Sequence, residues 1–187
     1  MKHQYSGKKS ARSSSIAATL PKLLPVILLF ASQLSFSQSK YIKKFRPLAD
    51  SLSAAYGVPA AVILGVAILE SGSGTSRNCK LLNNHFGVVG KNDLLKTKHV
   101  KTRYKQYASS LDSYIDFCKI VARKKFYKKL KDNDNYKLWV EALSKAGYSE
   151  IPEYWKTKVL ETIRKNKLSP PVKADTKALS SASRREY

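Results

Sequence analysis

The chain has 187 residues, which suffices for one domain with tails and is too short for a multidomain enzyme. Its 43% hydrophobic and 26% charged residues fit a water-soluble domain with a packed core and exclude a wholly disordered chain. With 35 Lys and Arg against 13 Asp and Glu, the formal net charge is +22. This charge predicts attraction to a polyanion but does not choose among nucleic acid, anionic lipid and acidic cell-wall polymer.

Cysteine and histidine are too sparse for a disulfide scaffold or a zinc site. The two cysteines, Cys79 and Cys118, are far apart in the sequence, and the three histidines are scattered. We therefore expect no metal and no cofactor. In an oxidising compartment the two cysteines would either form a disulfide or remain as two buried thiols, and the sequence leaves both open.

Residues 1–37 have the order of a secretory signal peptide. Basic residues without any acid come first, an apolar stretch follows at 23–31, and Ser35-Phe36-Ser37 closes the segment. The apolar stretch is about half of the roughly 20 residues that a membrane span requires. We therefore expect export to the periplasm, the cell envelope or the medium, and no stable membrane anchor after cleavage. Export favours an envelope polymer over nucleic acid as the partner.

The folded unit is expected at residues 38–168, and residues 169–187 are expected to form a disordered basic tail. Apolar residues recur at helical spacing through most of this unit, so the predicted fold class is mainly α. The expected helices cover 41–56, 59–70, 110–121, 136–146 and 152–167. In 59–70 a strand is the alternative, but the length and the Ala and Leu content favour a helix. Residues 88–107 change period and indicate a small extended or β-hairpin lobe.

Glu70 is the residue best placed for acid chemistry. It ends the most apolar predicted helix, and it is the sole carboxylate between Ser51 and Asn92. Val66 and Ile63 lie one and two turns before it on the same face, so its carboxyl group should emerge from the core. Desolvation raises the pKa of a carboxyl group, and a proton held near neutral pH is what a general acid requires. The alternative is a surface glutamate in the last turn of a helix.

The neighbours of Glu70 suit a saccharide. The Ser and Gly residues at 71–76 allow a sharp turn and leave space beside the carboxyl group. Residues 83–88, Asn-Asn-His-Phe-Gly-Val, supply amides for acetamido and hydroxyl groups and an aromatic face for a sugar ring. Nothing nearby in the sequence orients His85, so we expect it to be an exposed spacer rather than a catalytic base.

These segments resemble the N-acetylglucosaminidases of glycoside hydrolase family 73, the flagellar-type peptidoglycan hydrolases and autolysins. The resemblance lies in Glu-Ser-Gly-Ser-Gly-Thr-Ser at 70–76 and in the Asn-Asn-His-Phe-Gly-Val segment. A Tyr-rich segment at 104–114 and Gly147-Tyr148-Ser149 with Pro152-Glu153-Tyr154 follow in the family's order. The likeness spans about residues 41–166.

The resemblance implies a lysozyme-like helical domain that cleaves the β-1,4 bond after N-acetylglucosamine in peptidoglycan glycan strands. We expect the protein to be a monomer. The resemblance also implies Glu70 as the general acid and Tyr148 as the aromatic hydroxyl beside the reacting sugar, although packing is an equal alternative for Tyr148. The substrate-binding residues that it implies are Asn83, Asn84, Phe86, Gly87, Tyr104 and Tyr154.

The chain departs from the family at the second catalytic carboxylate. Many relatives carry it in the small lobe, but residues 94–111 contain no acid, which leaves Asp93 as the candidate. Without Asp93, the acetamido group of the substrate would act as nucleophile, or the protein would bind glycan with little turnover. The basic residues of the lobe would then meet stem-peptide carboxylates or form a solvated surface.

Two other functions stay open on the sequence. A lytic transglycosylase shares a helical fold and a Glu-Ser pair at a helix end, but its Gly-Leu-Met-Gln stretch is missing, since the single methionine is Met1. A noncatalytic cationic module that binds cell-wall glycan is the second alternative.

Overall fold

The computed structural model describes residues 20–170, with side chains from Ser37 onward. The chain divides into two units, residues 1–37 and 38–187, and the description below concerns the second. The predicted signal peptide falls outside the described residues except for helical backbone from Leu20, and so does the predicted tail beyond residue 170. Among the described residues, no helix is both long and apolar enough to cross a membrane.

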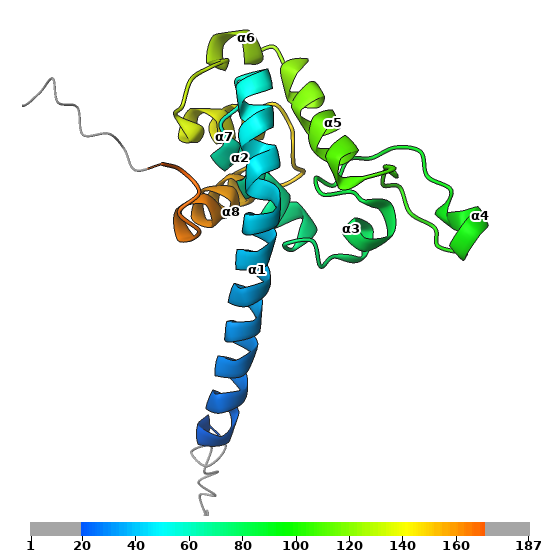
Figure 1. Cartoon of the computed structure of the whole chain (residues 1–187), viewed down its shortest axis with the longest axis vertical. Coiled ribbons are helices and arrows are strands. Elements are labelled where there is room, and N and C mark those ends of the chain that lie inside the picture. The colour runs from blue at the N-terminus through cyan, green and yellow to red at the C-terminus, as the bar shows by residue number, and fades with distance from the viewer. Residues whose placement is uncertain (1–19, 171–187) are drawn as a thin grey trace, which may run out of the picture. The chain divides into compact units, whose positions relative to one another are not determined.

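The described part of the chain is helical and contains no β-strand, which confirms the predicted fold class (Figure 1). A single isolated antiparallel bridge joins Val89 to Tyr104 in the expected extended lobe, residues 88–107, called the small lobe below. The helices are α1 (Leu20–Tyr56), α2 (Ala60–Ser71), α3 (Arg77–Leu82), α4 (Leu94–Lys98), α5 (Ser110–Ala122), α6 (Tyr127–Leu130), α7 (Tyr136–Lys145) and α8 (Pro152–Lys165).

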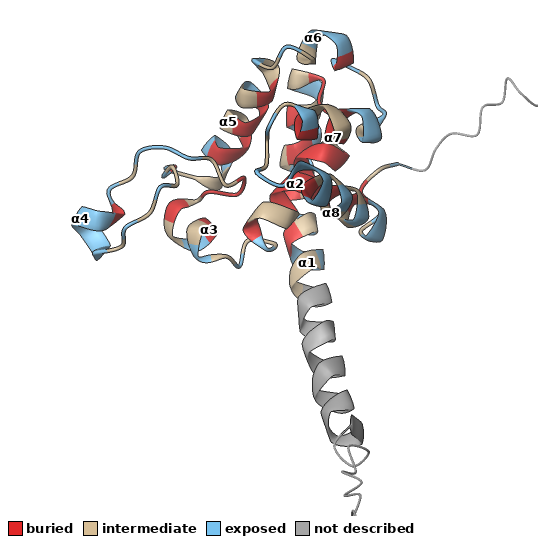
Figure 2. Ribbon diagram, turned by 180° about the vertical axis from the view of Figure 1, so that it is seen from behind, coloured by how far each residue is buried: buried red, intermediate tan, exposed pale blue. Residues whose placement is uncertain are grey.

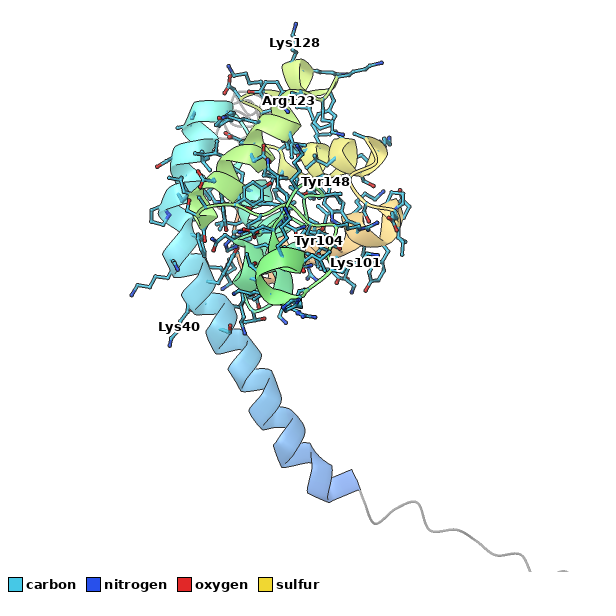
Figure 3. All side chains as sticks on the ribbon, turned by 90° about the vertical axis from the view of Figure 1, so that its right-hand side faces the viewer. Lys40, Lys101, Tyr104, Arg123, Lys128 and Tyr148 are labelled. Atoms are coloured by element: carbon cyan, nitrogen blue, oxygen red, sulfur yellow. The ribbon has the colours of Figure 1, made fainter. Side chains whose placement is uncertain are left out.

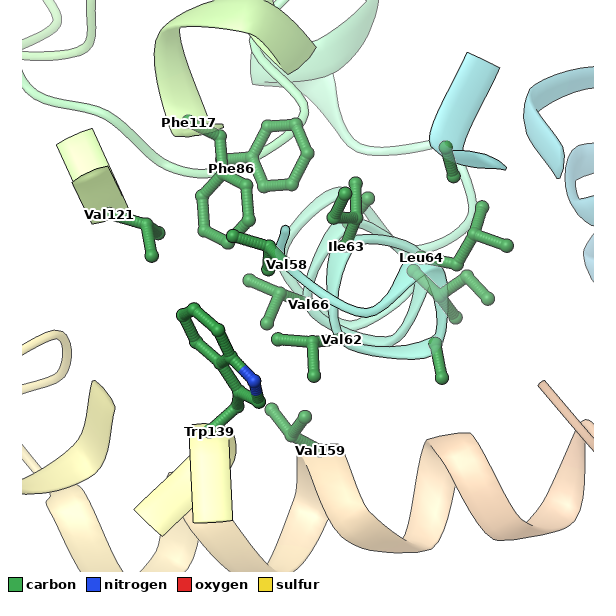
Figure 4. Packing of buried hydrophobic residues seen from close by; sticks show 14 of the residues in the cluster. Val58, Val62, Ile63, Leu64, Val66, Phe86, Phe117, Val121, Trp139 and Val159 are labelled. Atoms are coloured by element: carbon green, nitrogen blue, oxygen red, sulfur yellow. The ribbon is translucent and has the colours of Figure 1, made fainter. Parts of the chain in front are cut away.

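Helix α2 is the centre of the core. Every residue from Ala61 to Ile68 is buried, because the helix is apolar all round and is covered on all sides (Figure 2). Viewed along its axis, α2 is ringed by side chains from other segments, among them Phe117, Trp139 and Val159 (Figure 4). The helix ends at Gly72, whose φ of 56° is left-handed and whose N–H group bonds the Ile68 carbonyl oxygen.

The long predicted helices are all confirmed, and three short helices were not predicted. Ser109 caps α5, since its side chain accepts a hydrogen bond from the Asp112 N–H group. Gly147 follows α7 with a φ of 71°, as a stop residue should. Helices α3, α4 and α6 have four to six residues, too few to display a helical period in the sequence.

Backbone and amide hydrogen bonds hold the small lobe together. The Lys105 N–H group donates to the Val88 carbonyl oxygen at 2.8 Å. The Asn92 amide donates to the carbonyl oxygens of Thr102 and Tyr104 at 3.0 and 2.9 Å. These bonds hold the two arms of the lobe together, so residues 88–89 and 103–104 lie beside each other next to the end of α2.

Candidate active site

Glu70 lies at the C-terminal end of α2, where the core helix meets a groove. Its side chain is half-buried, and the Trp155 indole N–H group donates a hydrogen bond to Glu70 Oε1 at 2.7 Å. Gly87 approaches from the other side with a φ of 66°, and a Cβ atom there would lie 3.2 Å from Glu70 Oε2. A glycine is therefore needed at 87 both for the turn and for the close approach.

Burial raises the pKa of the Glu70 carboxyl group above its ordinary value. The bond from Trp155 acts in the opposite direction, since a donor stabilises the charged carboxylate, but burial is the larger effect. The group therefore keeps its proton to higher pH than a solvated glutamate does. This is the property that the sequence led us to expect of it.

The groove beside Glu70 has a volume of about 650 Å³ and an open side. The end of α2, the small lobe, the end of α5 and the segment between α7 and α8 all contribute to its walls. Figure 3 labels both tyrosines of the groove, Tyr104 from the small lobe and Tyr148 from the segment after α7. The lining residues are Glu70, Phe86, Gly87, Val88, Val89, Arg103, Tyr104, Ile120, Lys124, Gly147, Tyr148, Ser149, Glu150 and Ile151.

Tyr148 connects the segment after α7 to the loop at Phe86 and to helix α8. Its hydroxyl group donates to the Phe86 carbonyl oxygen at 3.0 Å, and its ring lies 5.0 Å from the Trp155 ring. Burial, together with the negative charge of Glu70, raises the pKa of Tyr148 well above its ordinary value. The hydroxyl group is therefore protonated and a hydrogen-bond donor at any physiological pH.

The structure brings five of the sequence-predicted site residues together: Glu70, Phe86, Gly87, Tyr104 and Tyr148 all line the groove. The other four do not line it. Asn84 is 1% exposed, and its amide donates to the carbonyl oxygens of Val88 and Lys105 at 2.8 Å each.

The remaining three predicted residues also lie outside the groove lining. Asn83 ends α3 in a left-handed conformation and donates to the Tyr107 carbonyl oxygen at 3.1 Å. Tyr154 is 63% exposed at the start of α8, and Asp93 stands at the N-terminus of α4. The two asparagines thus shape the loop that presents Phe86 and Gly87.

The polar and aromatic side chains at the site that were not predicted as site residues include Trp155, Arg103, Lys124 and Glu150. Nothing in the sequence indicates that the Trp155 N–H group meets a carboxyl group 85 positions earlier. Arg103 is one of the basic residues of the small lobe, which the sequence led us to treat as a group. Glu150 directly follows the Gly-Tyr-Ser segment, and this position was the one feature of the sequence that could have indicated a site residue.

The expectation that His85 is an exposed spacer is wrong, since His85 is 3% exposed. Its Nδ1 atom lies 2.7 Å from the Tyr41 hydroxyl group and its Nε2 atom 2.9 Å from Ser110 Oγ. Phe45 and Tyr114 pack against the ring. The partners come from α1 and α5, more than 20 positions away, so the local sequence could not reveal them.

The buried His85 should make the free energy of unfolding depend on pH. Burial, reinforced by the charge of Lys44, lowers the pKa of His85 to about 4. Between pH 6.5 and about 4 the unfolded chain takes up a proton that the folded chain excludes, so we expect the free energy of unfolding to fall as pH falls through this range. Denaturant titrations at pH 7 and pH 5 measure the difference.

The exposed histidine provides the control for this prediction. His99→Asn should leave the pH dependence unchanged, because His99 is exposed and Asn tolerates its left-handed backbone. His85→Asn should lower stability at pH 7 and flatten the difference between pH 7 and pH 5. An unchanged slope in His85→Asn would contradict the assignment.

Both cysteines are buried free thiols, so of the two alternatives for Cys79 and Cys118 the structure has the unpaired one. Cys79 Sγ lies 3.5 Å from both ring nitrogens of His85. Burial raises the pKa of Cys79 to about 11 and that of Cys118 to about 12, so both remain protonated and unreactive at neutral pH.

A glutamic acid with a raised pKa, at the end of a core helix and beside an open groove, is the arrangement of a helical glycoside hydrolase. The family model described as mannosyl-glycoprotein endo-beta-N-acetylglucosaminidase matches residues 46–168. The chain belongs to this glucosaminidase family.

Individual relatives agree with this assignment. The exo-glucosaminidase LytG of Bacillus subtilis is 28% identical over 156 residues, covering 74% of this chain and 55% of LytG, so the chain spans about half of the length of that relative. The glycoside hydrolase domain of Salmonella typhimurium FlgJ superposes with a TM-score of 0.55 at 26% identity, covering 70% of this chain and 88% of that domain. The catalytic domain of the Listeria monocytogenes autolysin Auto, 20% identical with a TM-score of 0.59 and coverages of 71% and 86%, shares the fold.

Proposed function

We propose that this protein is a peptidoglycan hydrolase that cleaves the β-1,4 bond after N-acetylglucosamine, with Glu70 as the general acid. The observation that carries the proposal is the Glu70 carboxyl group, half-buried with a raised pKa, at the wall of an open groove. Membership of the glucosaminidase family and the similarity to LytG and FlgJ support the substrate class. A peptidoglycan substrate places the protein outside the cytoplasm, in the cell envelope or beyond.

The other groove residues have distinct parts in this proposal. Tyr104 offers an aromatic face to a sugar ring from the small lobe. Tyr148 holds the Phe86-Gly87 turn against Glu70 through its bond to the Phe86 carbonyl oxygen. The proton that Glu70 carries goes to the glycosidic oxygen as the bond breaks, which removes the need for a poor alkoxide leaving group.

Digestion of purified sacculi by the full chain tests the proposal. We expect soluble fragments whose new reducing ends are N-acetylglucosamine, identified by mass spectrometry after borohydride reduction. Ends of the 1,6-anhydro type would instead indicate a lytic transglycosylase. Sacculi that bind the protein but stay intact at every pH tested would indicate a binding module and refute the proposal.

Trp155→Phe should move the alkaline limb of the pH–rate profile to higher pH. The indole N–H group stabilises the charged form of Glu70, so its loss raises the pKa of Glu70 further. A general acid acts in its protonated form, and the activity should therefore persist to higher pH. Rates of sacculus solubilisation across pH measure the limb.

Trp139→Phe is the matched control for this substitution. Trp139 also donates its indole N–H group, but to the Asn133 carbonyl oxygen and away from the groove. The alkaline limb of the pH–rate profile of Trp139→Phe should coincide with that of the unsubstituted protein. A limb that stays in place or moves to lower pH in Trp155→Phe would contradict the role given to the bond.

A further inference from the structure

Glycoside hydrolysis by a carboxylic acid ordinarily needs a second carboxylate, which activates the attacking water or forms the glycosyl bond itself. Asp93, the candidate from the sequence, does not line the groove. Among the described residues that do, Glu70 and Glu150 are the carboxylates. The position of Glu150 therefore bears on the reaction directly.

Glu150 enters the groove from a different element than Glu70. It lies in the segment between α7 and α8, where the consecutive residues Tyr148 to Ile151 all line the groove. Its side chain is 87% exposed, so water reaches the carboxylate. The Arg103 guanidinium group, on the small lobe, lies 3.5 Å from Glu150 Oε1, which joins two walls of the groove.

The two carboxyl groups differ in their surroundings, because Glu70 is half-buried and Glu150 is exposed to solvent. Glu70 sits against the core beside an indole ring, where a proton is retained. Glu150 stands in solvent beside the guanidinium group of Arg103. Two titratable groups in contrasting surroundings at one site define an acid and a base.

We propose that Glu150 is the general base of the reaction, which rests on the function proposed above. Glu150 takes a proton from water while the water oxygen bonds to the anomeric carbon, and the glycosidic C–O bond breaks as Glu70 gives its proton to the leaving oxygen. One water is consumed, and the proton on Glu150 returns to Glu70 through solvent. Direct attack by water inverts the anomeric centre, so the first product carries an α-anomeric reducing end.

Glu150→Gln should lower kcat by about 10² to 10⁴-fold while leaving binding to sacculi intact. The matched control is Glu153→Gln, three positions along, where the carboxylate pairs with Lys156 and does not line the groove. Asp93→Asn is measured beside them. We expect full activity from Glu153→Gln and from Asp93→Asn. Loss in Asp93→Asn with full activity in Glu150→Gln would overturn the assignment.

Rescue by azide distinguishes a general base from a residue that only supports the structure of the groove. In Glu150→Ala, azide occupies the space of the lost side chain, needs no base, and should restore cleavage with release of an α-glycosyl azide. Proton NMR of the reaction of the unsubstituted protein on soluble uncrosslinked glycan chains should show the α-anomer first. A β-anomer as the first product, or no rescue of an inactive but sacculus-binding variant, would overturn the proposal.

The two proposals fail in different ways. An inactive unsubstituted protein would refute the hydrolase itself. An active unsubstituted protein together with an active Glu150→Gln would leave the hydrolase standing and remove Glu150 from the reaction, in favour of the acetamido group of the substrate as nucleophile.

Discussion

Glu70→Gln is expected to lower kcat on purified sacculi by about 10³-fold, because the amide cannot give a proton to the glycosidic oxygen. Glutamine keeps the shape of the side chain and can still accept the bond from the Trp155 N–H group. Binding should therefore persist, since the groove walls are unchanged. Release of reducing ends measures kcat, and co-sedimentation with sacculi measures binding.

Glu161→Gln is the control for this substitution, because Glu161 is exposed on α8, where it pairs with Lys158. Its activity should equal that of the unsubstituted protein. If Glu70→Gln retained more than about a tenth of the activity, the loss would be too small for a general acid, and another group would have to protonate the leaving oxygen.

Trp139→Ala is expected to lower the free energy of unfolding by about 3 to 5 kcal/mol, the usual range for removing a large buried aromatic side chain. Trp139 is fully buried, its ring meets Phe126 and Tyr127 edge-on, and its N–H group bonds the Asn133 carbonyl oxygen at 2.8 Å. The substitution leaves a cavity beside α2 and an unpaired carbonyl group. Chemical denaturation followed by circular dichroism measures the loss.

The neighbouring residue on α7 supplies the control. Leu138 is 46% exposed, and Leu138→Ala should change the free energy of unfolding by less than about 1 kcal/mol. Equal losses in the two variants would mean that α7 is not packed as described. The two substituted residues are adjacent on α7, so they differ mainly in how deeply their side chains are buried.

The sequence alone could predict the parts of the fold that follow from local pattern. The burial of α2 follows from twelve nearly apolar residues, and its C-terminal turn follows from the Ser and Gly residues after Glu70. The raised pKa of Glu70 follows from both together. These features depend on residues that are neighbours along the chain, so a single sequence contains them.

The missed features depend on residues that only the fold brings together. The Trp155 N–H group and the Glu70 carboxylate meet across 85 positions, and His85 is enclosed by side chains of α1 and α5. Asn84 was expected to face the sugar because amides suit acetamido groups, but the loop uses its amide for backbone carbonyls. Local chemistry does not tell whether an amide serves a ligand or its own loop.

The placement of Glu70 on α2 joins chemistry to stability. Helix α2, buried from Ala61 to Ile68, carries the proton donor near its end, so small local openings at the surface should leave the donor in place. Glu150 stands in the connection between α7 and α8, with its side chain 87% exposed. The core therefore fixes the position of the acid, whereas the contact of the proposed base with Arg103 lies at the surface of the groove.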